Sequence, residues 1–135
     1  MPSKLFRITS FLALGASIAP AQSLAAGALA ELAAPLEIVV ERDASRVPAA
    51  KRLARIHAEN RDWASALRVL ERTAPHATKD AEYQGFAGTV LRQLKRSPEA
   101  VERYRAATRL APDDGRWWAG LGIAISLLLA VFADR

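Results

Sequence analysis

The chain has 135 residues, of which 51% are hydrophobic and 24% are charged, a balance typical of one small folded domain. It contains no cysteine, which excludes disulfides, thiolate metal sites and a cysteine nucleophile. The formal net charge is +5, but acidic and basic residues are interspersed. Because no long basic run occurs, the charge does not indicate a nucleic-acid-binding tail.

Residues 1–21 have the features of an export signal. Lys4 and Arg7 precede an apolar stretch over residues 8–21, and no acidic residue occurs before Glu31. The small residues at 19–21 fit a cleavage site, as do those at 23–25. We predict an exported, periplasmic or envelope-associated protein; if the segment is not a signal, the protein is cytoplasmic.

Residues 22–46 are predicted to be a linker or a degenerate helix. Residues 24–35 are rich in alanine and leucine, which favours a helix followed by a connector. Residues 36–40 read LEIVV, so a short strand or an extended linker is the alternative there.

A regular spacing begins after residue 46. When the chain is compared with itself at an offset of 34, Ala66 falls on Ala100, Leu70 falls on Tyr104, and Gly88 falls on Gly122. A constant period of this length indicates stacked copies of one structural unit.

These residues resemble the tetratricopeptide repeat, a helix-turn-helix unit with small residues, aromatics and a terminal proline at fixed positions. The resemblance implies an all-α solenoid of about two and a half repeats over residues 47–135, divided into 47–80, 81–114 and a partial unit 115–135. The residues that it assigns to packing between helices are Leu53, Ala54, Ala66, Leu70, Gly88, Leu91, Ala100, Tyr104, Ala107, Pro112, Trp118, Leu121 and Gly122.

The helix ends carry their own signals. Asp62 and Asp80 are placed to cap helices that begin at the next residue, because a carboxylate accepts hydrogen bonds from the free N–H groups of a first turn. Ser97 is expected to cap the next helix, with Pro98 in its first position. Pro112 cannot continue a helix and is expected to end one.

The last segment departs from the repeat, because no second helix follows it. Residues 117–133 contain no charged residue, and at 1.5 Å per residue they reach about 25 Å, short of a hydrocarbon core of about 30 Å. We expect an apolar terminal helix covered by the N-terminal segment, a second copy, a partner or lipid. A membrane-anchored envelope component and a truncated fragment of a longer array are the alternatives.

Few residues indicate chemistry. His57 and His76 are 19 positions apart without a ligand motif, and the sequence has no nucleophile motif or glycine-rich phosphate loop. We therefore predict no catalytic residue, no metal, no cofactor and no enzymatic activity. The arginines are spread along the helices, so nucleic acid is not an expected partner.

The resemblance also implies a binding surface, since first helices of tetratricopeptide units line a concave groove. The groove residues carried over by repeat position are Lys51, Arg52, Arg55, Phe86, Arg92 and Arg116, with Glu59, Glu82, Thr89 and Gln93 beside them. Five bases against two acids predict a positive groove that binds an acidic peptide or a terminal carboxylate. Solvated helix surfaces are the alternative.

A second likeness is local. The stretch APDDGRWWAGLGIAI, at residues 111–125, resembles the last repeats of bacterial proteins for type IV pilus biogenesis of the mannose-sensitive haemagglutinin kind. It implies an envelope scaffold in a pilus or secretion machine, binding a protein partner.

Overall fold

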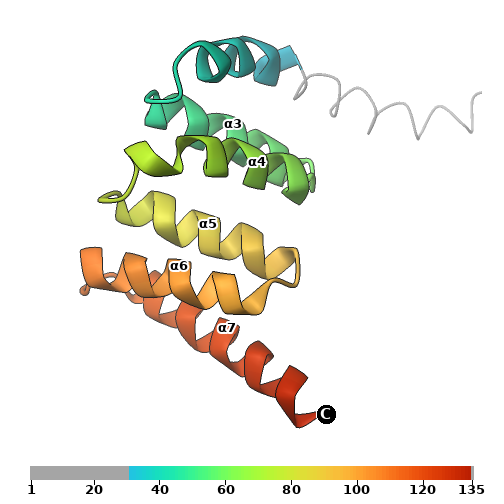
Figure 1. Cartoon of the computed structure of the whole chain (residues 1–135), viewed down its shortest axis with the longest axis vertical. Coiled ribbons are helices and arrows are strands. Elements are labelled where there is room, and N and C mark those ends of the chain that lie inside the picture. Colours follow the sequence, from blue (N-terminus) through green and yellow to red (C-terminus); the bar gives the residue numbers. More distant parts are fainter. Residues whose placement is uncertain (1–30, 135) are drawn as a thin grey trace, which may run out of the picture.

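A computed structural model describes residues 31–134, and within this range all regular structure is helical. A helix over residues 31–42 is followed by α3 (Val47–Glu59), α4 (Trp63–Thr73), the 3₁₀ turn η1 (Ala74–His76), α5 (Ala81–Gln93), α6 (Ser97–Leu110) and α7 (Gly115–Ala133). Each of the helices α3 to α7 packs against the next along the chain, and α5 also contacts α7 (Figure 1). The predicted all-α solenoid is confirmed.

The first described helix corrects one alternative from the sequence. Residues 36–40 are helical, so a strand or an extended linker there is wrong. Ala33 and Val40 lie two helical turns apart and are both buried against Ala50 and Leu53 of α3. One apolar stripe thus holds this helix on the solenoid. The predicted export signal and its cleavage site lie outside the described residues.

The turns between paired helices repeat at the same 34-residue offset. Arg61 and Lys95 have positive φ angles of 59° and 63°, and each N–H donates to a carbonyl three residues earlier. The following residues, Asp62 and Arg96, donate to carbonyls five residues earlier, at 2.8 and 2.9 Å. This is the pattern of a Schellman helix end. The two turns have equivalent hydrogen bonds although their sequences differ.

Aspartates cap three of the helices. Asp62 accepts from the Ser65 N–H at 3.1 Å and Asp80 from the Tyr83 N–H at 3.0 Å, as predicted, and Asp114 accepts from the Arg116 N–H at 3.0 Å. The predicted Ser97 cap is wrong. Ser97 is already the first residue of α6 and is buried, while Arg96 before it makes no side-chain cap.

Tyr104 of α6 joins the two helices on either side of it. A Cβ atom on Gly88 of α5 would lie 3.0 Å from the Tyr104 ring, and one on Gly120 of α7 would overlap the same ring. The Tyr104 hydroxyl is 2.7 Å from Oγ1 of Thr89 on α5. Two glycines are therefore required for α5 and α7 to pack this closely on one aromatic ring.

Candidate functional site

The six predicted groove residues all lie on α3, α5 and α7, the first helices of their units. Lys51, Arg52 and Arg55 belong to α3, Phe86 and Arg92 belong to α5, and Arg116 is in the first turn of α7. Helices α3 and α5 are joined on this side by side-chain contacts near the start of α5.

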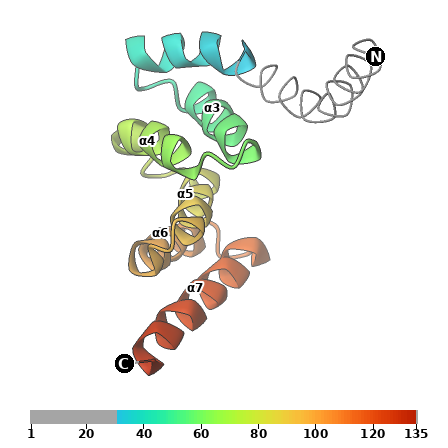
Figure 2. The same ribbon diagram turned by 90° about the vertical axis from the view of Figure 1, so that its right-hand side faces the viewer.

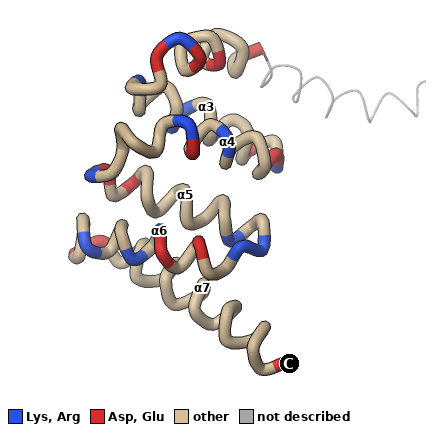
Figure 3. The backbone as a smooth tube through the Cα atoms, in the orientation of Figure 1, with Lys and Arg blue, Asp and Glu red and all other residues tan. Residues whose placement is uncertain are grey.

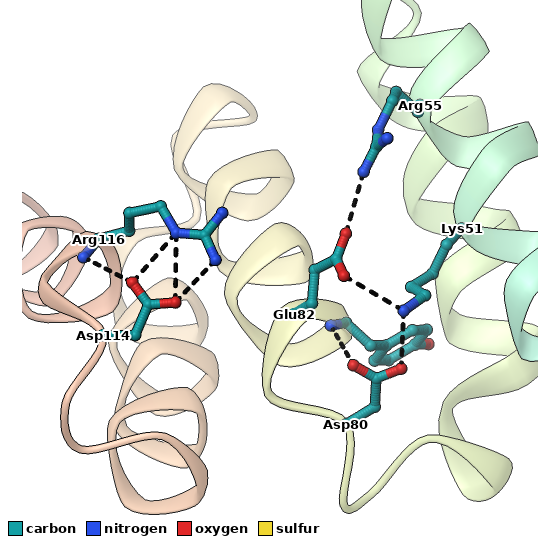
Figure 4. Close-up of polar contacts among 7 residues, drawn as sticks. Lys51, Arg55, Asp80, Glu82, Asp114 and Arg116 are labelled. Carbon is teal, nitrogen blue, oxygen red and sulfur yellow. Dashed lines mark hydrogen bonds and ion pairs between the residues drawn. The ribbon is translucent and has the colours of Figure 1, made fainter.

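Lys51 and Arg55 are both paired with acids (Figure 4). The Nζ atom of Lys51 lies 2.9 Å from Oδ2 of Asp80 and 3.5 Å from Oε2 of Glu82. A guanidinium nitrogen of Arg55 lies 3.0 Å from the other carboxylate oxygen of Glu82. These contacts connect two successive repeats and neutralise two of the five predicted bases.

Asp80 has two roles, as the cap of α5 and as the partner of Lys51. Its partial burial alone would raise the carboxyl pKa, but the backbone N–H of Tyr83 and the ammonium of Lys51 outweigh burial and lower that pKa below its ordinary value of 3.8. Burial would lower the pKa of Lys51, and the hydrogen bond to Asp80 with the charges of Asp80 and Glu82 raises it above 10.5. Both groups are therefore charged near neutral pH.

Arg116 is held by its own turn. A guanidinium nitrogen lies 2.7 Å from Oδ2 of Asp114, and the guanidinium carbon stands 4.7 Å from the centre of the Trp117 ring, within cation–π range. The hydrogen bond from Arg116 lowers the pKa of Asp114. Arg116 therefore has a counter-charge two residues away.

The positive charge of the groove is therefore smaller than the sequence predicted. The sequence count of five bases against two acids left out Asp80 and Asp114, which precede their helices and so did not occupy groove positions. Lys51, Arg55 and Arg116 are each paired. Among residues 31–134, Arg52 and Arg92 form no ion pair.

Arg92 is the residue of this group with an unmet polar atom. Its side chain is half-buried, and its Nε atom is buried with no hydrogen-bond partner in the described part of the chain. A buried donor without a partner is costly, but this Nε atom is inaccessible, so an external acceptor could meet only the solvent-facing part of the half-buried side chain. Phe86, six residues earlier on α5, is also half-buried.

Nine of the thirteen predicted packing residues are buried, Leu121 is half-buried, and Pro112, Trp118 and Gly122 are exposed. Trp118 is 51% exposed, and a Cβ atom on Gly122 would meet nothing within 4 Å, so their packing assignment is wrong. The residues in their place are Trp117, which is 8% exposed, and Gly120. The signal for Trp117 was its position 34 residues after the buried Tyr83.

A pocket lies away from these residues, between the helix over 31–42, α3 and α4. It has a volume of about 390 Å³ and open sides, and none of the predicted groove residues lines it. His57 lies in it with Nε2 3.7 Å from a carboxylate oxygen of Glu37. No pattern in the sequence predicted this pocket, because its residues come from three separate helices.

Over residues 31–134 no three His, Asp or Glu side chains are grouped so that they could hold a metal ion.

Helix α7 is long and apolar enough to cross a membrane by length and composition, with a mean hydropathy of 1.7. Figure 3 shows the same helix without charged residues along most of its length.

Comparisons by sequence find no relatives. No protein-family profile matches the chain, and no curated protein matches it significantly.

Solved structures with a similar fold do exist. A crystal structure of MamA superposes with a TM-score of 0.71 at 16% identity, covering 76% of this chain and 60% of that one. A second MamA structure gives 0.67 at 19% identity, covering 73% and 54%. MamA from Desulfovibrio magneticus RS-1, from residue 41 to its end, gives 0.60 at 16%, covering 79% and 66%. The chain thus spans about three-fifths of the first of these structures. MamA is a tetratricopeptide-like protein, and the chain described here has the same helical-repeat fold.

Proposed function

We propose that this protein is a non-enzymatic scaffold that binds a segment of a partner protein along the side of α3, α5 and α7 that carries the predicted groove residues. The observation that carries the proposal is Arg92, a half-buried arginine on α5 that forms no ion pair within residues 31–134. A carboxylate on the partner would supply a counter-charge for this guanidinium group.

The same surface also offers apolar contacts. Ile123 and Leu127 of α7 lie 34 residues after Thr89 and Gln93, two predicted groove positions, and they are 46% and 40% exposed. Phe86 adds a half-buried ring on α5. The expected ligand is therefore an amphipathic segment, in which apolar side chains accompany an acidic one, rather than a uniformly acidic peptide.

Replacing Arg92 with glutamine tests this function. Peptides selected from a random displayed library on the full chain are expected to contain Asp or Glu next to apolar residues. Arg92→Gln should weaken their binding by about 1.5–3 kcal/mol, roughly 10- to 150-fold, because a charged hydrogen bond is lost. The measurement is the dissociation constant by fluorescence anisotropy.

Arg109→Gln is the matched control, since Arg109 is an exposed arginine in the last turn of α6, a second helix. It should leave the dissociation constant unchanged. Equal affinity of the wild-type chain and Arg92→Gln would contradict the proposed site.

A second candidate is a membrane-anchored envelope component, which the hydropathy of α7 favours. The N-terminal half of α7, however, packs on α6, and α6 carries exposed charged residues such as Glu102 and Arg105. Full insertion of α7 would bring these charges into hydrocarbon, at a cost of several kcal/mol. Export, an envelope location and a pilus or secretion role remain predictions from residues 1–21 and 111–125.

A further inference from the structure

Helix α7 has an uncovered apolar face, and the equivalent face of α5 in the preceding repeat shows what kind of element would cover it. Trp117, Gly120 and Ala124 are buried against α5 and α6. Trp118 and Leu129 are 51% and 61% exposed, and the C-terminal half of the helix extends past α6 (Figures 1 and 2). The face thus covers a large part of one side of the helix.

The equivalent face of α5 is covered. At the 34-residue offset, Gln84, Gly88 and Leu91 correspond to Trp118, Gly122 and Ile125. On α5 these three residues are buried. Helix α6 contributes the Tyr104 ring on Gly88 and a hydrogen bond of 3.1 Å from Arg103 to Gln84. The open face of α7, defined as Trp118, Gly122, Ile125 and Leu129, is therefore equivalent to the face of α5 that α6 covers, although Ile125 is half-buried against the core.

The other end of the solenoid offers such a helix. Leu32, Leu36 and Val39 of the helix over 31–42 correspond to Ala100, Tyr104 and Ala107 of α6, at twice the 34-residue offset. All three residues of α6 are at most 1% exposed, whereas Leu32 and Val39 are 63% and 40% exposed. We call Leu32, Leu36 and Val39 the open face of the helix over 31–42; Leu36 is half-buried, because it also packs against the cluster that includes Ala50 and Leu53 of α3.

We propose that these two faces bind each other between copies of this chain, so that the helix over 31–42 of one copy packs on α7 of the next. They lie at opposite ends of the stack and do not meet within one chain (Figure 2). Within residues 31–134, no helix lies on α7 in the position of α6, and none lies on the helix over 31–42 in the position of α5. Head-to-tail contact supplies both and continues the solenoid.

Other occupants fit less of what is observed. A symmetric pair of α7 helices would place two first-helix faces together and leave Leu32 and Val39 exposed. A lipid surface would cover the end of α7, but it would not account for the match between the open face and the covered face of α5. Both alternatives are outcomes of the experiment below.

The chain has no cysteine, so single cysteines report contacts without background. Tyr104 lies on Gly88, and the equivalent residues at the open ends are Leu36 and Gly122. Full chains carrying Leu36→Cys and Gly122→Cys, with different tags, are mixed and mildly oxidised. We expect a mixed disulfide dimer, because a disulfide requires Cβ atoms within about 4.5 Å. The double variant should give a ladder of higher oligomers, since the contact does not close.

Ile123→Cys is the matched control, because Ile123 is the next residue, is 46% exposed and lies about 100° around the helix. It should not cross-link to Leu36→Cys. A second pair, Leu32→Cys with Ser126→Cys, tests the same register without altering the half-buried Leu36. Both positions are exposed, Leu32 one helical turn before Leu36 and Ser126 one turn after Gly122.

Three results would overturn the proposal. Disulfides between two Gly122→Cys chains alone would show a symmetric pair. Absence of both expected mixed disulfides, in chains with wild-type helicity by circular dichroism, would show that lipid, another protein or the N-terminal segment covers α7 instead of a second copy. Equal cross-linking of Ile123→Cys would show contact without a defined register.

Discussion

Replacing Trp117 with alanine is expected to lower the free energy of unfolding by about 3–5 kcal/mol, the usual cost of removing a large buried aromatic side chain. The Trp117 ring is 8% exposed and lies against Gly85, where any Cβ atom would overlap it. The contact joins the first helices of two successive repeats. Its loss therefore leaves a cavity between α5 and α7, measurable by urea unfolding followed by circular dichroism.

Trp118→Ala is the matched control. Trp118 is 51% exposed, and its Nε1 donates to the Pro112 carbonyl oxygen at 2.8 Å. The expected loss is about 1–2 kcal/mol, from one exposed hydrogen bond and a half-covered ring. A larger loss for Trp118 than for Trp117 would mean that α7 is rotated into the register that the tetratricopeptide pattern assigned.

Two glycines of α7 are expected to respond in opposite directions to alanine. Gly120→Ala should destabilise the chain by about 1–3 kcal/mol, because the new methyl group overlaps the buried Tyr104 ring and overpacks the contact. The ring has little freedom to retreat, since it is 1% exposed and its hydroxyl is bonded to Thr89. The measurement is again the free energy of unfolding.

Gly122→Ala should stabilise the chain by about 0.5–1 kcal/mol, because alanine loses less backbone entropy than glycine in a helix. Its methyl group meets nothing within 4 Å. Because both substitutions are in one helix, differences in helix propensity largely cancel between them. Similar effects of the two changes would contradict the contact between Gly120 and Tyr104.

Much of the fold could be predicted because the repeat leaves its period in the small buried residues. Ala66 and Ala100 are both fully buried, and Leu70 and Tyr104, 34 residues apart, are both 1% exposed. Asp62 and Asp80 cap the helices expected to follow them. A helix crossing restricts side-chain size strongly, so this part of the pattern remains visible in one sequence.

The rotation of α7 about its axis, which decides whether Trp117 or Trp118 faces the core, could not be predicted from the sequence in the same way. Trp117 and Trp118 are adjacent identical residues, and the family pattern favoured the second. The structure buries the first, because Gly85 on α5 leaves room for its ring. Small residues on a neighbouring helix decide this choice, and their position is known only once the helices are stacked.

The net charge of the groove could not be predicted by counting the residues at the repeat's groove positions. Asp80 and Asp114 belong to turns, yet their carboxylates reach Lys51 and Arg116 at 2.9 and 2.7 Å. Helix caps point back over the first turn and so contribute charge to the neighbouring surface.

The central claim is that α5 and α7 are equivalent helices that pack on either side of Tyr104. Nuclear Overhauser effects from the Tyr104 ring protons in the full chain measure this directly. We predict contacts to the α protons of both Gly88 and Gly120. Contacts to Gly122 in place of Gly120, or none to Gly88, would contradict the stacking and the functional account built on it.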